Sequence, residues 1–484
     1  MPINRIYQWA RVQPHKVAIV YNDFALNYLT FALTIEAARK FFEQQKLPAG
    51  RMAIVLVDNL VSSWVLVIAL RALGLNTIAV KSIAEAETLR IRDVACVVTT
   101  QPEQHLHNLN RPNSLGAKII VVPADIRTND LLASYQHKPE QFGNHVIFSS
   151  GTTAALYKKM IMNGAFEEKR CEESARTWMF EQRTVYHATD FGIWSGMGFK
   201  AAPALWHIGA TVIFDQRPDK FQYFFRNRFS STFLMPLQLD ELLRTVTAPR
   251  TEAFDLLTGA GFLSAELSDK AHSLLPAARH MNHFGVAELI AVPFRSFVKS
   301  SEDLLWFTPM PERTVEIVDD DGAPCAVDQE GELRISLTGQ DCTSYLDDEA
   351  ATARAFRGGF IYPGDMAVKR ADGRVRVLGR TADVLNVRGS KMAVAPLEEA
   401  IRRELLAQEV CIFGGLDDKG VEEIVVAVQS DKEVTEAQRN MAATKLPSFI
   451  RVRFSVMKEF PRTEGGLRKV RRTELRKMVF PKTN

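Results

Sequence analysis

The chain has 484 residues, of which 46% are hydrophobic and 24% are charged, a composition typical of soluble globular proteins. One ordinary core cannot organise a chain of this length, so about two to four domains or subdomains are expected. Sixty Lys and Arg against 57 Asp and Glu leave a formal net charge of +3. That balance points to neither nucleic acid nor an anionic membrane surface as the main partner.

Cysteine usage and hydropathy indicate which cellular compartment to expect and whether a membrane span is present. Five widely separated cysteines, none in a C-x-x-C pair, predict a reduced, cytoplasmic protein without a zinc site. The N-terminus lacks the apolar segment of a signal peptide, so none is expected. The longest apolar stretch, Trp64 to Leu75, is too short to cross a membrane and contains Arg71. The sequence therefore predicts no membrane span.

The first half of the chain alternates short β-rich runs with helical patterns. The helical patterns run from Thr30 to Phe42 and from Ser62 to Leu73. The β-rich runs are 17–22, 52–57, 77–80, 95–99, 118–122, 211–214 and 232–235. Strand–helix–strand alternation of this kind predicts parallel α/β layers.

The pattern changes in the second half. Residues 313–340 predict a strand, a turn and a strand, and a second antiparallel pair brackets the turn Arg370 to Arg374. A compact α+β unit is then predicted from a helix at 396–406, strands at 410–413, 424–428 and 452–456, and a helix that begins with the capping box Thr435-Glu-Ala-Gln438. We therefore expect two domains, 1–382 and 383–484.

One segment suggests the chemistry of a site. The apolar run Val146 to Phe148 predicts a buried strand that leads into Ser149-Ser-Gly-Thr-Thr153, with lysines a few residues later. Hydroxyls and backbone N–H groups around a glycine can turn toward a polyanion, which makes the loop a candidate for binding nucleotide phosphates. An ordinary Ser/Thr-rich turn explains the same residues, and no Walker G-x-x-x-x-G-K-[ST] pattern is present.

Further motifs follow that the general fold does not explain. They are Gly259-Ala-Gly-Phe-Leu-Ser264, Asn282-His-Phe-Gly-Val-Ala-Glu288, Gly331-Glu-Leu-Arg334, Tyr345, Tyr362-Pro-Gly-Asp365, Gly379-Arg-Thr-Ala-Asp383 and the basic segment Pro461 to Arg472. In this order and at these separations they resemble the core motifs of the adenylate-forming superfamily. That superfamily includes acyl-CoA synthetases, adenylation domains of peptide synthetases and firefly-type luciferases, and the resemblance covers nearly the whole chain.

The resemblance implies an α/β fold, with a large N-terminal α/β domain of parallel sheets plus a β section and a small mobile C-terminal α+β domain. It also implies two half-reactions. ATP-dependent adenylation of a carboxylic acid releases pyrophosphate, and the acyl group then passes to a thiol. Coenzyme A is the expected acceptor, with the pantetheine of an acyl or peptidyl carrier protein as the alternative. Mg²⁺ is implied because charge around the attacked phosphate must be screened.

The resemblance also implies roles for individual residues. Glu288 would bind Mg²⁺, which prefers oxygen ligands. Asp365 and Arg380 would contact the ribose or phosphate, Asp383 would be the hinge, and Lys469 would be the catalytic lysine. The remaining nucleotide-binding positions would be Ser149, Ser150, Gly151, Thr152, Thr153, Lys158, Gly259, Ala260, His283, Phe284 and Gly285.

The chain departs from the family pattern at three places. In the phosphate loop Ala154, Leu156 and Tyr157 stand where the family has glycine, proline and lysine, so Lys158 comes one position late. Ala287 replaces a usual threonine before Glu288. Leu467 and Arg468 separate Gly466 from Lys469, which makes Arg468 a rival for the catalytic position. These departures indicate a divergent member whose activity is weakened or altered.

Three functions stay open at this point. An acyl-CoA synthetase is favoured by the segment Asp383 to Glu398, where a lysine follows two residues after a glycine. Activation of an amino acid or aryl acid is suggested by Thr189-Asp-Phe-Gly-Ile-Trp194, because an aspartate at this spacing pairs with the substrate's ammonium in adenylation domains. Asp190 as the cap of a helix beginning at Phe191 is the simpler interpretation. The altered loop suggests a non-catalytic nucleotide-binding homologue.

Overall fold

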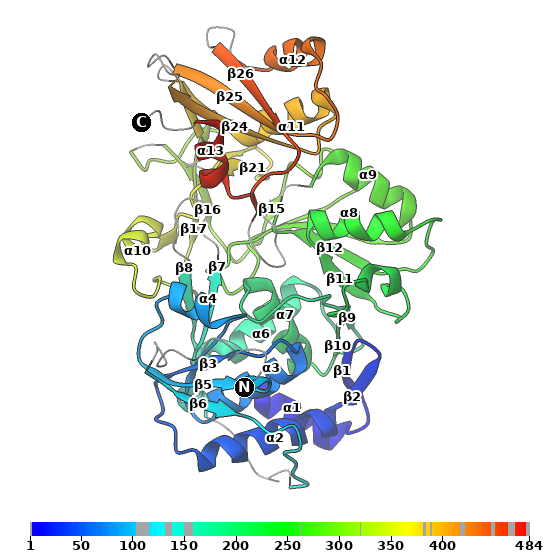
Figure 1. Cartoon of the computed structure of the whole chain (residues 1–484), viewed down its shortest axis with the longest axis vertical. Coiled ribbons are helices and arrows are strands. Elements are labelled where there is room, and N and C mark those ends of the chain that lie inside the picture. Colours follow the sequence, from blue (N-terminus) through cyan, green and yellow to red (C-terminus); the bar gives the residue numbers. More distant parts are fainter. Residues whose placement is uncertain are drawn as a thin grey trace. The chain divides into compact units, whose positions relative to one another are not determined.

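The computed structural model describes residues 2–102, 116–130, 138–149, 158–261, 263–319, 321–380, 384–387, 390–416, 422–446, 451–462 and 470–480. The chain divides into two compact units (Figure 1). The first comprises Met1–Ser150, Leu156–Lys299 and Leu337–Ala353, and the second comprises Gly151–Ala155, Ser300–Ser336 and Arg354–Asn484. The predicted division into 1–382 and 383–484 stays a prediction.

The first unit contains a six-stranded sheet in the order β6-β5-β3-β4-β7-β8. Its strands are β3 Met52–Val55, β4 Asn76–Ala79, β5 Val94–Thr99, β6 Lys118–Val121, β7 His145–Ser149 and β8 Lys158–Met162. The first five strands of this order pair in parallel, whereas β7 and β8 form an antiparallel hairpin. The inner strands β3, β4 and β5 are largely buried, as parallel pairing requires, whereas the edge strand β6 is partly exposed.

A second sheet of the first unit runs in the order β14-β13-β12-β11-β9-β10-β1-β2. Its strands are β1 Val17–Tyr21, β2 Phe24–Asn27, β9 Val185–His187, β10 Thr211–Phe214, β11 Ser231–Leu234, β12 Asp255–Gly259, β13 Arg279–Phe284 and β14 Phe294–Phe297. Pairing is parallel from β13 to β1, and antiparallel strands flank it at β14 and β2. The predicted parallel α/β layers are confirmed.

Helices of the first unit cover these sheets. They are α1 Pro2–Val12, α2 Tyr28–Gln44, α3 Leu60–Ala72, α4 Ile83–Thr88, α6 Glu167–Thr177, α7 Gly196–His207, α8 Pro236–Thr245 and α9 Ala265–Leu274. Helix α3 packs on β3 and β4, and α6 lies along α7. An aromatic cluster joins α3 to α7, with the ring of Trp64 5.8 Å from that of Phe199 and 5.2 Å from that of Trp206.

The second unit begins with an antiparallel sheet. Its strands are β16 Val315–Val318, β17 Glu330–Ser336, β18 Phe356–Arg357, β19 Phe360–Ile361, β20 Asp365–Lys369 and β21 Val375–Arg380. The short strand β15 Thr308–Pro309 also belongs to this unit, whereas most of helix α10 Glu349–Ala355 belongs to the first unit. Strands β16 and β17 form the pair predicted at 313–340, and β20 and β21 are joined by the predicted turn.

A three-stranded sheet, β24-β25-β26, organises the C-terminal part of the second unit. The elements here are β22 Val384–Val387, β23 Ser390–Ala393, α11 Val394–Leu405, β24 Glu409–Leu416, β25 Glu422–Gln429, α12 Glu436–Ala443, β26 Arg451–Met457 and α13 Arg472–Val479. Thr435 caps α12 through the predicted capping box with Gln438. The predicted α+β character of this segment is confirmed.

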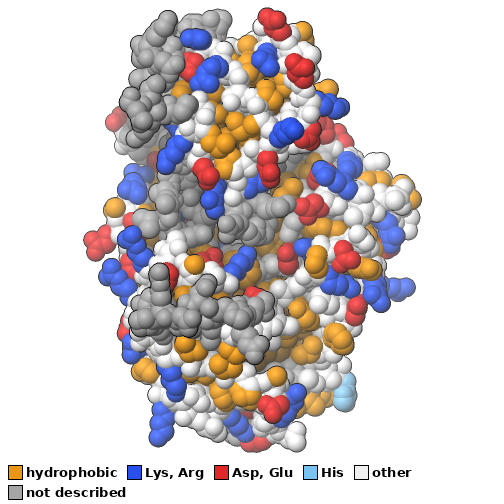
Figure 2. Space-filling view, in the orientation of Figure 1, with side chains coloured by type: hydrophobic (Ala, Val, Ile, Leu, Met, Phe, Trp, Pro, Cys, Tyr) orange, Lys and Arg blue, Asp and Glu red, His pale blue; other side chains and the backbone are white. Residues whose placement is uncertain are grey.

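Two surface and chemical properties complete the description. On the face drawn in Figure 2 the basic and acidic side chains of the described residues are interspersed, in keeping with the small net charge. The five cysteines are free thiols. Among the described helices, none has both the length and the apolar character that a membrane crossing requires.

Candidate functional site

The predicted phosphate loop connects two strands of a hairpin. Strand β7 ends at Ser149 and β8 begins at Lys158, and these two residues lie directly opposite each other in the antiparallel pair. Three buried apolar residues, Val146, Ile147 and Phe148, form β7, as predicted. Residues Ser150 to Thr153 lie outside the described residues, so their contact with phosphate stays a prediction.

The two lysines that open β8 have different surroundings. The half-buried Lys158 has its Nζ 3.4 Å from the Tyr345 hydroxyl and 4.8 Å from the centre of that ring. Lys159 is buried, and its Nζ lies 2.9 Å from a carboxylate oxygen of Asp347 and 3.0 Å from the carbonyl oxygen of Leu89. Successive residues of a strand point to opposite sides. Lys159 is therefore occupied in the interior, whereas Lys158 lies on the side of Tyr345.

Tyr345 links the displaced lysine to the predicted Mg²⁺ ligand. Its hydroxyl donates a hydrogen bond of 2.5 Å to Oε1 of Glu288. Glu288 is half-buried, in the turn between β13 and β14. The fold thus brings Lys158 and Glu288 to the same residue from distant parts of the chain. Sequence analysis placed Tyr345 in a family motif but assigned it no role, and a lone tyrosine carries no stronger signal.

The donor chemistry at Glu288 fits a magnesium ion. Mg²⁺ is commonly held by one or two carboxylates, with substrate phosphates and water completing its octahedron. The hydrogen bond from Tyr345 uses one of the two carboxylate oxygens of Glu288, so the other can serve as a ligand. The ammonium of Lys158 and the carboxylate of Glu288 both contact the Tyr345 hydroxyl.

A second group of predicted residues gathers at the carboxyl ends of β12 and β13. These strands are parallel neighbours, and Gly259 lies opposite His283. A Cβ atom on Gly259 would lie 2.6 Å from the carbonyl oxygen of His283, so the close approach requires glycine. Ala260 follows with a φ of 59°, in the left-handed region. Ligands of parallel α/β sheets bind outside such strand ends.

The side chains at these strand ends differ in accessibility. The ring of His283 is buried, and burial lowers its pKa to about 4, so the ring is neutral at pH 7. A nucleotide contact from His283 would therefore use its backbone. Phe284 is half-buried, with its ring 5.7 Å from that of Phe294 in an edge-on arrangement, and Gly285 is exposed. Ala260, Phe284 and Gly285 are the accessible members of the predicted set at these strand ends.

The predicted ribose residues meet in the second unit. Asp365 opens β20 and Arg380 ends β21, and the two residues lie directly opposite each other. Asp365 is buried. For Arg380 the structure describes the backbone position alone. The hinge residue Asp383, the catalytic candidate Lys469 and its rival Arg468 lie outside the described residues.

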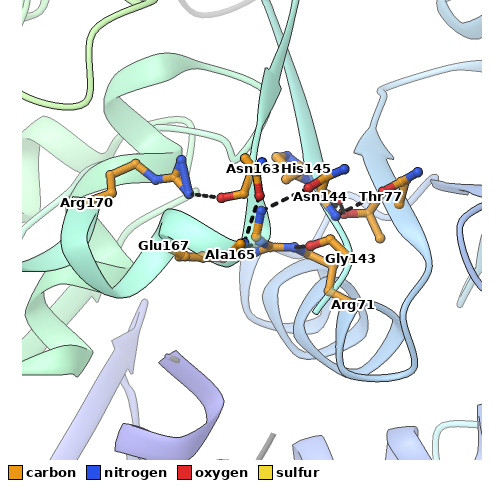
Figure 3. Close-up of polar contacts among 11 residues, drawn as sticks. Arg71, Thr77, Gly143, Asn144, His145, Asn163, Ala165, Glu167 and Arg170 are labelled. Atoms are coloured by element: carbon orange, nitrogen blue, oxygen red, sulfur yellow. Dashed lines mark hydrogen bonds and ion pairs between the residues drawn. The ribbon is translucent and has the colours of Figure 1, made fainter. Parts of the chain in front are cut away.

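A buried polar network holds the base of the β7–β8 hairpin (Figure 3). The guanidinium of Arg71, on α3, donates to the Gly143 carbonyl at 2.8 Å and makes a two-pronged ion pair with Glu167. Arg170 donates to the carbonyl of Asn163, just after β8, at 2.9 Å. The charged side chains are almost completely buried. The network therefore fixes the chain just before β7 and just after β8.

His145, the first residue of β7, belongs to the same network. Its ring lies between Thr77 Oγ1, 2.8 Å from Nδ1, and the Ile193 carbonyl oxygen, 3.0 Å from Nε2. Burial lowers the pKa of His145 to about 3, and the nearby positive charge of Arg71 acts in the same direction. The neutral ring donates through Nε2 and accepts from the Thr77 hydroxyl. Sequence analysis missed this network because its members come from four separate segments.

The interpretation of Asp190 as a helix cap is wrong. Helix α7 begins at Gly196, and its cap is Ser195, whose hydroxyl accepts from the Gly198 N–H at 3.1 Å. Asp190 instead forms an ion pair with Lys220, 3.3 Å from Nζ to Oδ2, and accepts a 3.4 Å hydrogen bond from Gln238. The carboxylate that sequence analysis considered for a substrate ammonium is thus balanced by a cation of the protein.

Comparisons with known proteins agree with this architecture. A family model described as AMP-binding enzyme matches residues 6–340. The chain belongs to the AMP-binding enzyme family. It is 29% identical over 167 residues to a medium/long-chain-fatty-acid–CoA ligase of Mycobacterium marinum. That match covers 32% of this chain and 32% of the ligase, so the chain spans about a third of the length of such relatives.

Solved structures match over nearly the whole chain. An anthranilate CoA ligase in complex with anthranoyl-AMP has a TM-score of 0.84 at 15% identity, covering 99% of this chain and 96% of that one. An o-succinylbenzoate CoA synthetase from Bacillus subtilis, in complex with ATP and magnesium ion, has a TM-score of 0.83 at 18% identity, covering 98% and 99%. At these identities the likeness shows the fold, and the expected α/β class is confirmed.

Proposed function

We propose that the protein is an AMP-forming acid–thiol ligase that adenylates a carboxylic acid with ATP and passes the acyl group to coenzyme A. The observation that carries the proposal is the meeting of Lys158 and Glu288 at Tyr345, beside the end of the hairpin that holds the predicted phosphate loop. A cation and a carboxylate at one place are what a Mg²⁺-bound polyphosphate needs.

In the proposed first half-reaction the phosphate loop and the residues at the ends of β12 and β13 bind and orient ATP. The loop from Ser149 to Thr153 and Lys158 hold the β- and γ-phosphates, so that pyrophosphate can leave as the substrate carboxylate attacks the α-phosphate. Glu288 holds Mg²⁺, which when bound offsets the charge of the triphosphate. Gly259, Ala260, Phe284 and Gly285 bind the adenosine part at the strand ends.

Residues of the second unit are proposed to complete both half-reactions. Asp365 accepts hydrogen bonds from the ribose hydroxyls, with Arg380 opposite it in the sheet. Lys469 contacts the carboxylate and the α-phosphate during adenylation, and Asp383 is the hinge between the half-reactions. The pantetheine of a carrier protein is the alternative acceptor, because coenzyme A and such a carrier both present the thiol of a pantetheine group.

Pyrophosphate exchange into ATP tests the adenylation step. Purified protein should exchange pyrophosphate with at least one member of a broad carboxylic-acid panel, and adding coenzyme A should convert that acid to its thioester. Lys469→Ala should abolish the exchange, whereas Arg468→Ala should leave most of it. If Arg468→Ala abolished the exchange and Lys469→Ala left most of it, the catalytic role would belong to Arg468. ATP binding without exchange across the whole panel would favour the non-catalytic homologue.

Amino-acid activation is the less favoured function. A substrate ammonium near Asp190 would have to compete with Lys220, which already balances that carboxylate. Acids without an ammonium group face no such competition. Fatty and aromatic acids should therefore support faster exchange than amino acids at equal concentration. A clear preference for amino acids would contradict this assignment.

A further inference from the structure

Helix α7 carries a lysine in an unusual place. Lys200 lies among apolar residues of α7 and is 7% exposed, and its ammonium donates to the carbonyl oxygens of Ala287 at 2.8 Å and Leu289 at 2.5 Å. Among the described residues the ammonium forms no ion pair. A buried ammonium without a carboxylate partner is costly. The two hydrogen bonds of Lys200 therefore indicate which backbone groups this lysine holds in place.

The two carbonyls flank Glu288 in the chain. The carbonyl of Glu288 itself accepts from the Cys342 N–H at 2.9 Å, and the N–H of Ile290, two residues later, donates to Asp341 at 2.8 Å. Successive residues of this turn, from 287 to 290, are thus bound alternately by Lys200 and by the segment 341–342. The same turn presents the Glu288 carboxylate to the Tyr345 hydroxyl.

Charges around Lys200 keep it a donor at neutral pH. Burial lowers the pKa of Lys200 to about 8, and the positive charge of Arg170 on α6 acts in the same direction. The carboxylates of Glu288 and Asp341 and the thiol of Cys342 raise the pKa. At pH 7 the side chain is therefore mostly protonated and can donate to both carbonyls.

We propose that Lys200 is a positioning residue for metal-bound ATP: by holding the carbonyls on both sides of Glu288, it fixes that carboxylate against Tyr345 and Lys158. The inference rests on the proposed role of Glu288 in binding Mg²⁺. Lys200 itself touches neither ATP nor the ion. Removing the Lys200 ammonium releases the turn, so that the Glu288 carboxylate is no longer held in one position for the metal ion.

Calorimetry of ATP binding, with Mg²⁺ and with EDTA, tests the inference without relying on turnover. In the unaltered protein Mg²⁺ should tighten ATP binding. Lys200→Met removes both hydrogen bonds at similar side-chain length, and should lose about tenfold or more of that Mg²⁺-dependent gain. Its ATP affinity in EDTA should stay within about twofold. Lys200→Arg keeps donors for the carbonyls and should restore much of the gain.

Matched variants separate positioning from a general loss of stability. Lys16→Met removes another lysine–carbonyl hydrogen bond, to Gln182 at 2.8 Å, and should leave the Mg²⁺ effect unchanged. Glu288→Gln should lose the same gain as Lys200→Met. The double variant should be no worse than Glu288→Gln alone, because both changes act through one carboxylate. If Lys200→Met does not fold, Lys200→Gln takes its place in these comparisons.

The outcomes distinguish the inference from the function on which it rests. A full Mg²⁺ gain in folded Lys200→Met, with the gain lost in Glu288→Gln, would overturn the positioning role and leave the proposed function intact. An unchanged gain in Glu288→Gln would remove Glu288 from the metal site and the inference with it. Additive losses in the double variant would show that Lys200 does not act through Glu288.

Discussion

The neighbouring lysines of β8 allow a direct test of the proposed phosphate site. Lys158→Met and Lys159→Met remove one ammonium each from adjacent positions, with the same change in composition. Lys158 lies beside Tyr345, which contacts Glu288, whereas Lys159 is paired with Asp347 inside the unit. The two variants should therefore fail in different ways.

The expected magnitudes follow from these surroundings. A charge-assisted hydrogen bond to phosphate contributes about 1.5–3 kcal/mol, so Lys158→Met should weaken ATP binding by about 10- to 150-fold. Its thermal midpoint should change little because the side chain is half-buried and makes only a 3.4 Å contact. Lys159→Met leaves Asp347 and the Leu89 carbonyl without their donor. Because Asp347 is 32% exposed, the loss of stability should lie near or below the roughly 3 kcal/mol expected of a fully buried pair.

Isothermal titration calorimetry with Mg·ATP and thermal unfolding measure the two effects on the same preparations. The expected pattern is weak ATP binding at normal stability for Lys158→Met, and normal ATP binding at lower stability for Lys159→Met. Equal ATP affinity in Lys158→Met and the unaltered protein would refute its phosphate contact. A loss of affinity in Lys159→Met alone would show that the two faces of β8 have been assigned the wrong way round.

Three other predictions concern stability and substrate choice. Burial holds the pKa of five histidines at about 3 to 4, so they stay neutral in the folded protein while the unfolded chain takes up protons below pH 6.5; they are His145, His187, His207, His280 and His283. Stability should thus fall as pH drops below 6.5, by about 1.4 kcal/mol each at pH 5.5 and about 7 kcal/mol together, and equal urea midpoints at pH 7.5 and 5.5 would contradict this. Arg71→Met leaves Glu167 buried without its cation and should cost about 3–5 kcal/mol by urea denaturation, whereas a cost below about 1 kcal/mol would show that the network is dispensable. Asp190→Asn should change pyrophosphate exchange with fatty or aromatic acids by less than about threefold, since its partner is Lys220; selective loss with amino acids would instead support ammonium binding.

Local patterns predicted many of the strands, whereas helices such as α6 and α9 were not anticipated. The apolar run at 146–148 became β7, and the capping box at Thr435 begins α12 as expected. Both depend on residues a few positions apart, which the sequence displays directly. Strand β8 was not anticipated, and it forms by antiparallel pairing with β7. Its two lysines contact different residues of the 345–347 segment, which no local pattern reveals.

The candidate site likewise has a part that the sequence predicted and a part that only the fold revealed. Residue types and their order were enough to identify the family, since motifs preserve spacing along the chain. The roles of Glu288, Asp365 and Arg380 stay predictions, and the pairing of Asp365 with Arg380 came from the fold. The residue pattern was misleading at Asp190. It suggested a helix cap, whereas in the folded protein the Asp190 carboxylate forms an ion pair with Lys220. A side chain's partner depends on packing between segments that are distant in sequence.

The sequence by itself predicted the family of this chain, through short motifs whose residues lie close together in the sequence. Only the tertiary structure decided which lysine lies beside Tyr345, the partner of Glu288, because the pleat of β8 turns Lys158 and Lys159 to opposite sides. It also revealed Lys200, which looks like a stray charge in an apolar helix until the carbonyls of Ala287 and Leu289 are found at its ammonium. Hydrogen bonds between distant segments exist only once those segments are packed, and the positions of the reactive groups depend on them.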